Sequence, residues 1–64
     1  MDSKIYDVLL GEYQSKIQVL TEALARGSCA GIEEYRYICG QIRGLEAACA
    51  TITDLKQRLE QNDE

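Results

Sequence analysis

Large apolar residues recur at steps of three and four on both sides of one glycine-rich break, and this spacing strongly limits the folds open to the chain. In the first half these residues are Tyr6, Leu10, Tyr13, Ile17, Leu20 and Leu24. In the second half they are Tyr35, Ile38, Ile42, Leu45, Cys49, Ile52 and, after Lys56 interrupts, Leu59. Alternating steps of three and four keep side chains on one stripe of an α-helix. The spacing predicts two amphipathic helices.

The break is the segment 27–31, Gly-Ser-Cys-Ala-Gly, in a sequence that contains no proline. Gly27 follows Arg26 at the position where a left-handed residue commonly ends a helix. Asp2 or Ser3 is suited to capping the first turn. We therefore expect a helix over 3–26, a turn over 27–31, a helix over 32–60 and a frayed acidic tail over 61–64. The predicted fold is all-α, a single domain over 1–64 built as an antiparallel two-helix hairpin.

Charged residues fit the same boundaries. Glu33 and Glu34 lie near the expected start of the second helix, where the helix dipole favours negative charge. Acid-to-base pairs four residues apart, the spacing of neighbours on a helix surface, occur at Glu12 and Lys16, Glu22 and Arg26, and Asp54 and Arg58.

A chain of 64 residues removes too little surface from water to be very stable alone, and small folds usually need a disulfide, a metal or a partner. The three cysteines, Cys29, Cys39 and Cys49, are odd in number and form no Cys-x-x-Cys pair, so we expect them to be reduced. The sequence has no histidine, and three scattered thiols do not make an ordinary zinc site. We therefore expect no metal or cofactor, and a homo-oligomer, with a dimeric four-helix bundle favoured.

The second helix has a further face beside its main stripe, made of small and apolar residues. The members of this face are Tyr37, Gly40, Gly44, Ala48, Thr51 and Leu55. A glycine inside a helix costs about 1 kcal/mol relative to alanine. Gly40 and Gly44 could receive bulky side chains of the first helix, such as Tyr13 or Ile17. We favour the alternative that they seat the second helix of another copy, and we assign this face to self-association.

Catalytic chemistry finds no support in the sequence. Without histidine there is no Ser-His or Cys-His nucleophile pair. Glu33, Glu34 and Glu46 are expected on solvent faces without a cleft that would raise the pKa of a carboxyl group. The turn lacks the lysine of a phosphate-binding loop. The prediction is that the chain is not an enzyme.

The formal net charge of −4 disfavours nucleic-acid and anionic-membrane binding, which rest on clustered Lys and Arg. No segment is long and apolar enough to span a membrane, and we expect a cytoplasmic location. Arg36 and Tyr37 are residue types common at protein interface hot spots, and they are candidates for contact with a partner. Tyr35 is expected in the core.

The segment 35–46, Tyr-Arg-Tyr-Ile-Cys-Gly-Gln-Ile-Arg-Gly-Leu-Glu, resembles small helical proteins encoded among the virion-structure and assembly genes of tailed double-stranded DNA phages. The resemblance covers about the second half of the chain. It implies an accessory or assembly role in the bacterial host cytoplasm or in the virion, with a virion or host protein as a partner. It also implies that Tyr35, Arg36, Gly40 and Gly44 matter together.

Two functions follow as hypotheses. The first is a non-enzymatic, self-associating helical adaptor that contributes to particle assembly or to contact with a host protein. The alternative is a small dimeric hairpin that binds RNA, similar in architecture to the plasmid copy-number regulator that binds paired RNA loops. Arg36, Arg43 and Lys4 are interspersed with acids, which disfavours this alternative.

Overall fold

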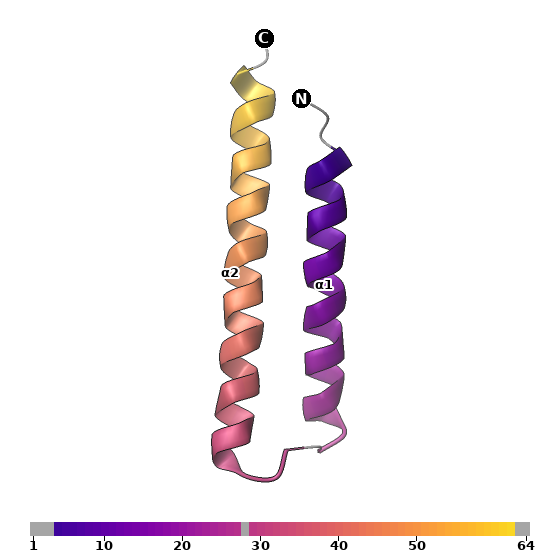
Figure 1. The fold of residues 1–64 in the computed structure, drawn as a ribbon. Helices are drawn as coiled ribbons and strands as arrows, with labels where there is room; N and C mark the ends of the chain where they lie inside the picture. The colour runs from indigo at the N-terminus through magenta and orange to yellow at the C-terminus, as the bar shows by residue number, and fades with distance from the viewer. Residues whose placement is uncertain (1–3, 28, 63–64) are drawn as a thin grey trace.

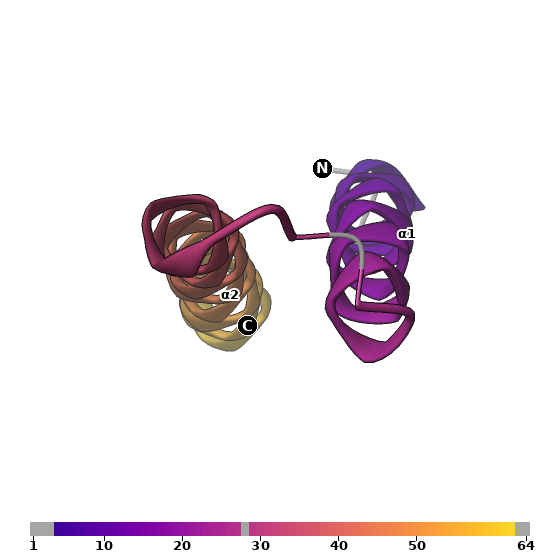
Figure 2. The same cartoon turned by 90° about the horizontal axis from the view of Figure 1, so that it is seen from below.

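The computed structural model describes residues 4–27 and 29–62 and contains two helices. Helix α1 spans Lys4–Ala25 and helix α2 spans Ile32–Asn62. They lie side by side and run in opposite directions, so the predicted all-α antiparallel hairpin is confirmed (Figures 1 and 2). The described part of the chain contains no strand.

The turn between the helices has the termination signals that the sequence predicts. Gly27 takes a left-handed conformation with φ of 71°, which glycine adopts without steric cost. Its N–H donates to the carbonyl of Leu24 at 3.0 Å, and the N–H of Arg26 donates to the carbonyl of Glu22 at 2.9 Å. These bonds satisfy carbonyls that the end of a helix otherwise leaves without a partner.

The start of α2 is held by its own first turn. The Glu34 carboxylate accepts a hydrogen bond at 3.0 Å from the backbone N–H of Ala30. The N–H of Tyr35 donates to the carbonyl of Gly31 at 3.1 Å. Glu33 and Glu34 both lie in this first turn, as predicted, where the helix dipole favours negative charge.

The helix ends differ slightly from the predicted boundaries. Helix α2 continues through 61 and 62, where the sequence suggested a frayed tail, because residues 55–61 are mostly strong helix formers with no glycine or proline among them. The capping residues expected at Asp2 and Ser3 fall outside the described residues, as do 63 and 64.

The hairpin is a thin rod. Its principal extents are 51 × 15 × 11 Å and its radius of gyration is 15.1 Å, against about 11 Å for a globular domain of this length. Helix α2 is nine residues longer than α1, with 31 residues against 22, and it extends beyond α1 (Figure 1). A rod of two helices has a single line of contact, and this leaves most side chains at least partly exposed.

Candidate self-association surface

The contact line between the helices is formed by the two predicted stripes. The half-buried side chains of α1 include all six of its predicted stripe residues. On α2 the stripe residues from Ile38 to Leu59 are buried or half-buried, including Lys56. Ile38, at 9% exposed, is the one side chain among the described residues that counts as buried. Two helices alone therefore do not complete a hydrophobic core.

Tyr35 is an exception to the predicted stripe, because it is 49% exposed and does not lie in the core. It occupies the first turn of α2, and the register set by the contact of Lys56 with Asp7 places it past the level of Ala25, where α1 ends. A side-chain hydrogen bond with Cys39 raises the pKa of its hydroxyl above the usual 10.0. Tyr35 and Cys39 therefore lie together on the surface near the turn.

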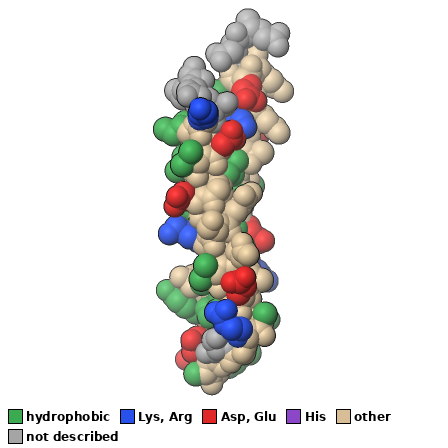
Figure 3. Space-filling view, turned by 90° about the vertical axis from the view of Figure 1, so that its right-hand side faces the viewer, with side chains coloured by type: hydrophobic (Ala, Val, Ile, Leu, Met, Phe, Trp, Pro, Cys, Tyr) green, Lys and Arg blue, Asp and Glu red, His purple; other side chains and the backbone are tan. Residues whose placement is uncertain are grey.

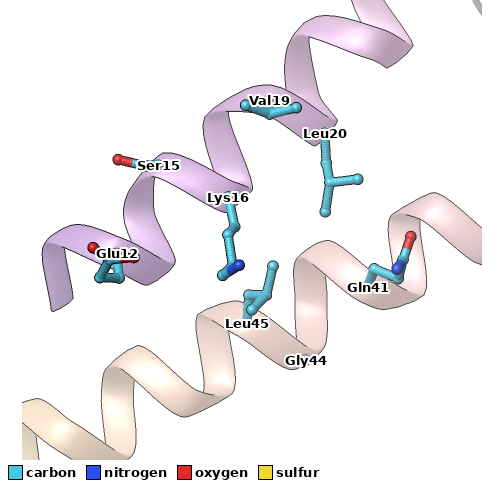
Figure 4. A pocket seen from close by; sticks show the side chains of 8 residues that line it. All are labelled: Glu12, Ser15, Lys16, Val19, Leu20, Gln41, Gly44 and Leu45. Atoms are coloured by element: carbon cyan, nitrogen blue, oxygen red, sulfur yellow. The ribbon is translucent and has the colours of Figure 1, made fainter. Parts of the chain in front are cut away.

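One side of the hairpin carries a shallow groove lined by both helices (Figure 4). Its volume is about 660 Å³. Leu20 and Lys16 of α1 point toward Leu45 of α2, and Gly44 lies beside Leu45 (Figure 4). The remaining lining residues are Glu12, Ser15, Val19 and Gln41. The groove shows that Gly44 on α2 and Val19 on α1 belong to the same side of the molecule.

The glycine face predicted on α2 is open on this side. A Cβ atom added at Gly40 or at Gly44 would meet no described atom within 4 Å. The hypothesis that these glycines receive side chains of α1, such as Tyr13 or Ile17, is therefore wrong for the isolated hairpin. The space beside both glycines is unfilled.

The other predicted members of the face are placed around these glycines. Tyr37 is 67% exposed and Leu55 is also exposed, while Ala48 is half-buried. The Thr51 hydroxyl donates to the carbonyl of Ala47 at 3.0 Å, so its polar hydrogen is satisfied within the helix. Such a threonine can face an apolar partner without losing a hydrogen bond.

Helix α1 adds a row of exposed apolar residues that the sequence analysis did not assign to a surface. Val8 and Val19 are each 62% exposed, and Ile5 and Leu9 are also exposed. At ~100° per residue, Ile5, Val8 and Val19 fall within about 60° of one another. Because Val19 lines the groove, the row flanks the groove opposite the glycine face of α2. The helical wheel that located the glycine face would have located this row too.

We define the apolar face as the exposed row on α1, the glycine face of α2 and the groove between them. The row on α1 is Ile5, Val8, Leu9 and Val19, and the glycine face is Tyr37, Gly40, Gly44, Ala48, Thr51 and Leu55. Figure 3 looks onto the α1 side of the molecule and shows groups of hydrophobic side chains near the upper and lower parts of its left-hand edge, with charged groups between them. Single exposed apolar residues are normal for a soluble protein, whereas apolar residues gathered on one face make it a candidate interaction site.

Arg36 and Tyr37, the predicted partner-contact residues, are both exposed. Tyr35 and Tyr37 are about 160° apart around a helix that turns ~100° per residue, so their rings lie on different sides of α2. They do not form one stacking platform with Arg36. Tyr37 belongs to the apolar face, and Tyr35 lies with Cys39 elsewhere.

An ion pair joins the helices at the end far from the turn. The Lys56 ammonium donates to the Asp7 carboxylate at 2.7 Å, and the Lys56 side chain is 26% exposed. This contact explains how the stripe of α2 tolerates a lysine. Of the three predicted surface pairs, the described residues form one, between Asp54 and Arg58 at 3.1 Å.

The hydrogen bond to Asp7 is the largest cause that raises the pKa of Lys56 above 10.5. A raised lysine pKa means that the charged form stabilises the fold, so this contribution is complete below pH 10.5 and is lost as the pH rises further. We expect the thermal midpoint to fall more steeply above that pH with Lys56 present than in Lys56→Met. Both chains should carry Tyr35→Phe, because the raised pKa of Tyr35 gives a loss in the same range. Equal slopes would contradict the prediction.

The described residues contain no group of three or more Cys, Asp or Glu side chains placed to hold a metal ion. Cys29, Cys39 and Cys49 are free and half-buried. Over the described ranges, neither helix has a stretch long and apolar enough to cross a lipid bilayer.

Comparison of the chain with family models, curated proteins and solved structures finds no match.

Proposed function

We propose that this chain is a self-associating helical adaptor whose working form is a dimeric four-helix bundle. In this proposal the second copy covers the apolar face and completes the core that two helices leave open. The assembled bundle serves as a structural accessory, not as an enzyme.

The observation that carries the proposal is the surface area of the single chain. The chain exposes 4989 Å², whereas a compact monomer of 7.2 kDa exposes about 4100 Å². The excess of about 900 Å² is close to the ~800 Å² that each partner loses in a protein–protein interface of standard size. An interface of standard size with a second copy would therefore lower the exposed area of each chain to about that of a compact monomer of the same mass.

The oligomeric state tests this proposal directly. We expect sedimentation equilibrium in reducing buffer to give twice the 7.2 kDa chain mass over a concentration series. On dilution the mass should fall toward that of the single chain, because association depends on protein concentration. A helical species of 7.2 kDa at every concentration would contradict the proposal.

The adaptor role is the second part of the proposal. The resemblance of segment 35–46 to phage virion-structure and assembly proteins supports a role in particle assembly or in contact with a host protein. In the bundle, the turn end with Arg36 stays accessible, because it lies away from the groove. Affinity capture from infected bacterial lysate should recover a virion or host protein with the wild-type chain and lose it with Arg36→Ala. Equal recovery by both chains would show that Arg36 takes no part in the contact with the partner.

RNA binding is the second candidate, and the exposure of Tyr35, Arg36 and Tyr37 is the observation in its favour. The two rings point to different sides of α2, and Glu33 and Glu34 lie directly beside them. A gel-shift titration at low salt, which strengthens electrostatic association, tests it. Absence of binding to structured and single-stranded RNA would exclude this candidate.

A further inference from the structure

We infer that the second copy docks upside down, with the turns of the two hairpins at opposite ends of the bundle. In this arrangement α2 packs antiparallel on α2 of the second copy, and α1 packs on α1. The inference rests on the proposed self-association and specifies its geometry.

The register between the two helices gives the level of each residue along the rod. Lys56 contacts Asp7 at one end, and Gly44 and Val19 line the same groove nearer the other. At ~1.5 Å rise per residue, these two pairs place Leu55 beside Val8 and Gly40 beside Ala23, to within about one helical turn.

The apolar face is therefore bulky at one end and hollow at the other. Toward the chain ends it carries Ile5, Val8, Leu9 and Leu55, all of them exposed. Toward the turn it carries Ala23, Gly40 and Gly44, with Val19 beside Gly44, and the added Cβ positions at both glycines meet empty space. Tyr37 lies beyond this hollow, in the second turn of α2.

This taper distinguishes the two ways of stacking identical hairpins. If both turns lay at the same end, Val8 would face Leu55 of the second copy, and Ala23 would face Gly40. Large would meet large at the chain ends and small would meet small at Gly40, while Val19 would face Gly44. Inversion of the second copy places each bulky end over a hollow end, and such complementary packing is what protein interiors and interfaces require.

The two-fold axis of the inverted arrangement passes close to Ala48. Leu55 then lies over Gly40 of the second copy, and Thr51 lies over Gly44. Small residues at these positions let the α2 helices approach closely, because the distance between helix axes depends on the side chains at the contact. The Thr51 hydroxyl is already bonded to Ala47, so it enters the contact satisfied.

Charges on α1 fit the same axis. Glu12 and Lys16 line the groove, and within the described residues neither forms an ion pair. Ala48 lies at about the level of Ser15. With the axis at this level, Glu12 of each copy lies about 3 Å along the rod from Lys16 of the other. Two symmetry-related ion pairs can then form between Glu12 and Lys16. In the arrangement with both turns at the same end, these two side chains would instead face α2 of the second copy.

Disulfide trapping tests the arrangement. The chain with Cys29→Ser, Cys39→Ala and Cys49→Ala receives Ala48→Cys, is checked for helix content and dimer mass, and is then oxidised. Two cysteines join only when their Cα atoms lie within about 7 Å. The inverted arrangement predicts that most of the chain runs at twice its mass on a non-reducing gel. The control is an equimolar mixture of chains with Val8→Cys and with Leu55→Cys, which should give no mixed dimer.

The outcomes separate this inference from the proposed function. A cross-link at Ala48→Cys supports inversion. A mixed Val8→Cys and Leu55→Cys dimer without an Ala48→Cys dimer overturns it in favour of turns at the same end. A chain that sediments as a dimer but gives neither product places the interface elsewhere and also overturns it. A chain that sediments as a monomer contradicts the proposed function itself.

A second measurement needs no substitution. In a mixture of isotope-labelled and unlabelled wild-type chains, filtered nuclear Overhauser spectra detect only contacts between copies. Inversion predicts contacts from the Leu55 methyl groups to the Gly40 α-protons of the other copy. Contacts from Leu55 to Val8 methyl groups of the other copy would overturn the inference even if the cysteine-free chain failed to fold.

Discussion

Replacement of Gly44 by leucine should convert the dimer into a monomer or a rearranged oligomer while leaving the hairpin helical. Within one chain the Cβ of the new side chain meets open space. Leucine also favours a helix interior over glycine by about 0.8 kcal/mol. Between copies the leucine fills the hollow where α2 approaches α2. We therefore expect normal or increased helix content per chain at high concentration and a loss of the dimer mass, measured by circular dichroism and sedimentation on the same sample.

Gly11→Leu is the matched control for this substitution. Gly11 is also a helical glycine with open space at its Cβ, but it lies on α1, at the margin of the apolar face and about 140° around the helix from Lys16, so it is not part of the contact between the α2 helices. The control should gain similar helix propensity and keep the dimer mass. If Gly44→Leu also kept the wild-type mass, the glycine face would not be the interface.

The second large effect is expected at Ile38. Removal of a buried isoleucine side chain to alanine costs about 2–5 kcal/mol, and Ile38 is the most deeply buried residue of the described hairpin. A domain of this length has a total stability of about 3–10 kcal/mol. Ile38→Ala should therefore lower the midpoint of urea unfolding severely, and at low concentration it should leave the chain largely unfolded.

Ile32→Ala makes the same chemical change at the start of α2, where the side chain is 64% exposed. It should change the midpoint by less than a quarter as much, because little surface is uncovered. Unfolding must be compared at one protein concentration, since association contributes to apparent stability. Equal effects of the two substitutions would mean that Ile38 does not lie in the contact between α1 and α2.

The fold could be predicted because local and long-range signals agree. The alternating steps of three and four, the absence of proline and the single glycine-rich turn all specify two helices, and Gly27 takes the expected left-handed conformation. The failure at Tyr35 has a physical reason. Periodicity gives the side of a helix on which a residue lies but not how far the neighbouring helix extends, and α1 ends at Ala25, before the level of Tyr35 in the register set by Lys56 and Asp7.

The candidate surface was predicted only in part. The glycine face of α2 stood out because glycines are costly inside a helix. The row on α1 was not assigned to a surface, although the same helical wheel separates it from the apolar stripe. Its meaning depends on which flank of α1 lies next to Gly44, and this requires the register of the hairpin. The Asp7 and Lys56 pair, 49 residues apart, was likewise invisible to patterns that compare residues four apart.

The ion pair of Asp7 and Lys56 also bears on which part of the hairpin can change in length. Sliding of one helix along the other by a turn would leave Lys56 among apolar side chains without its carboxylate. The alignment of the helices is thus specified at the end farthest from the connection between them. Doubling the length of a flexible connection costs only about 0.6 kcal/mol in closure entropy. The segment between Ala25 and Ile32 can therefore accept inserted residues, including a tag or a short binding peptide, at little cost to the arrangement of the two helices.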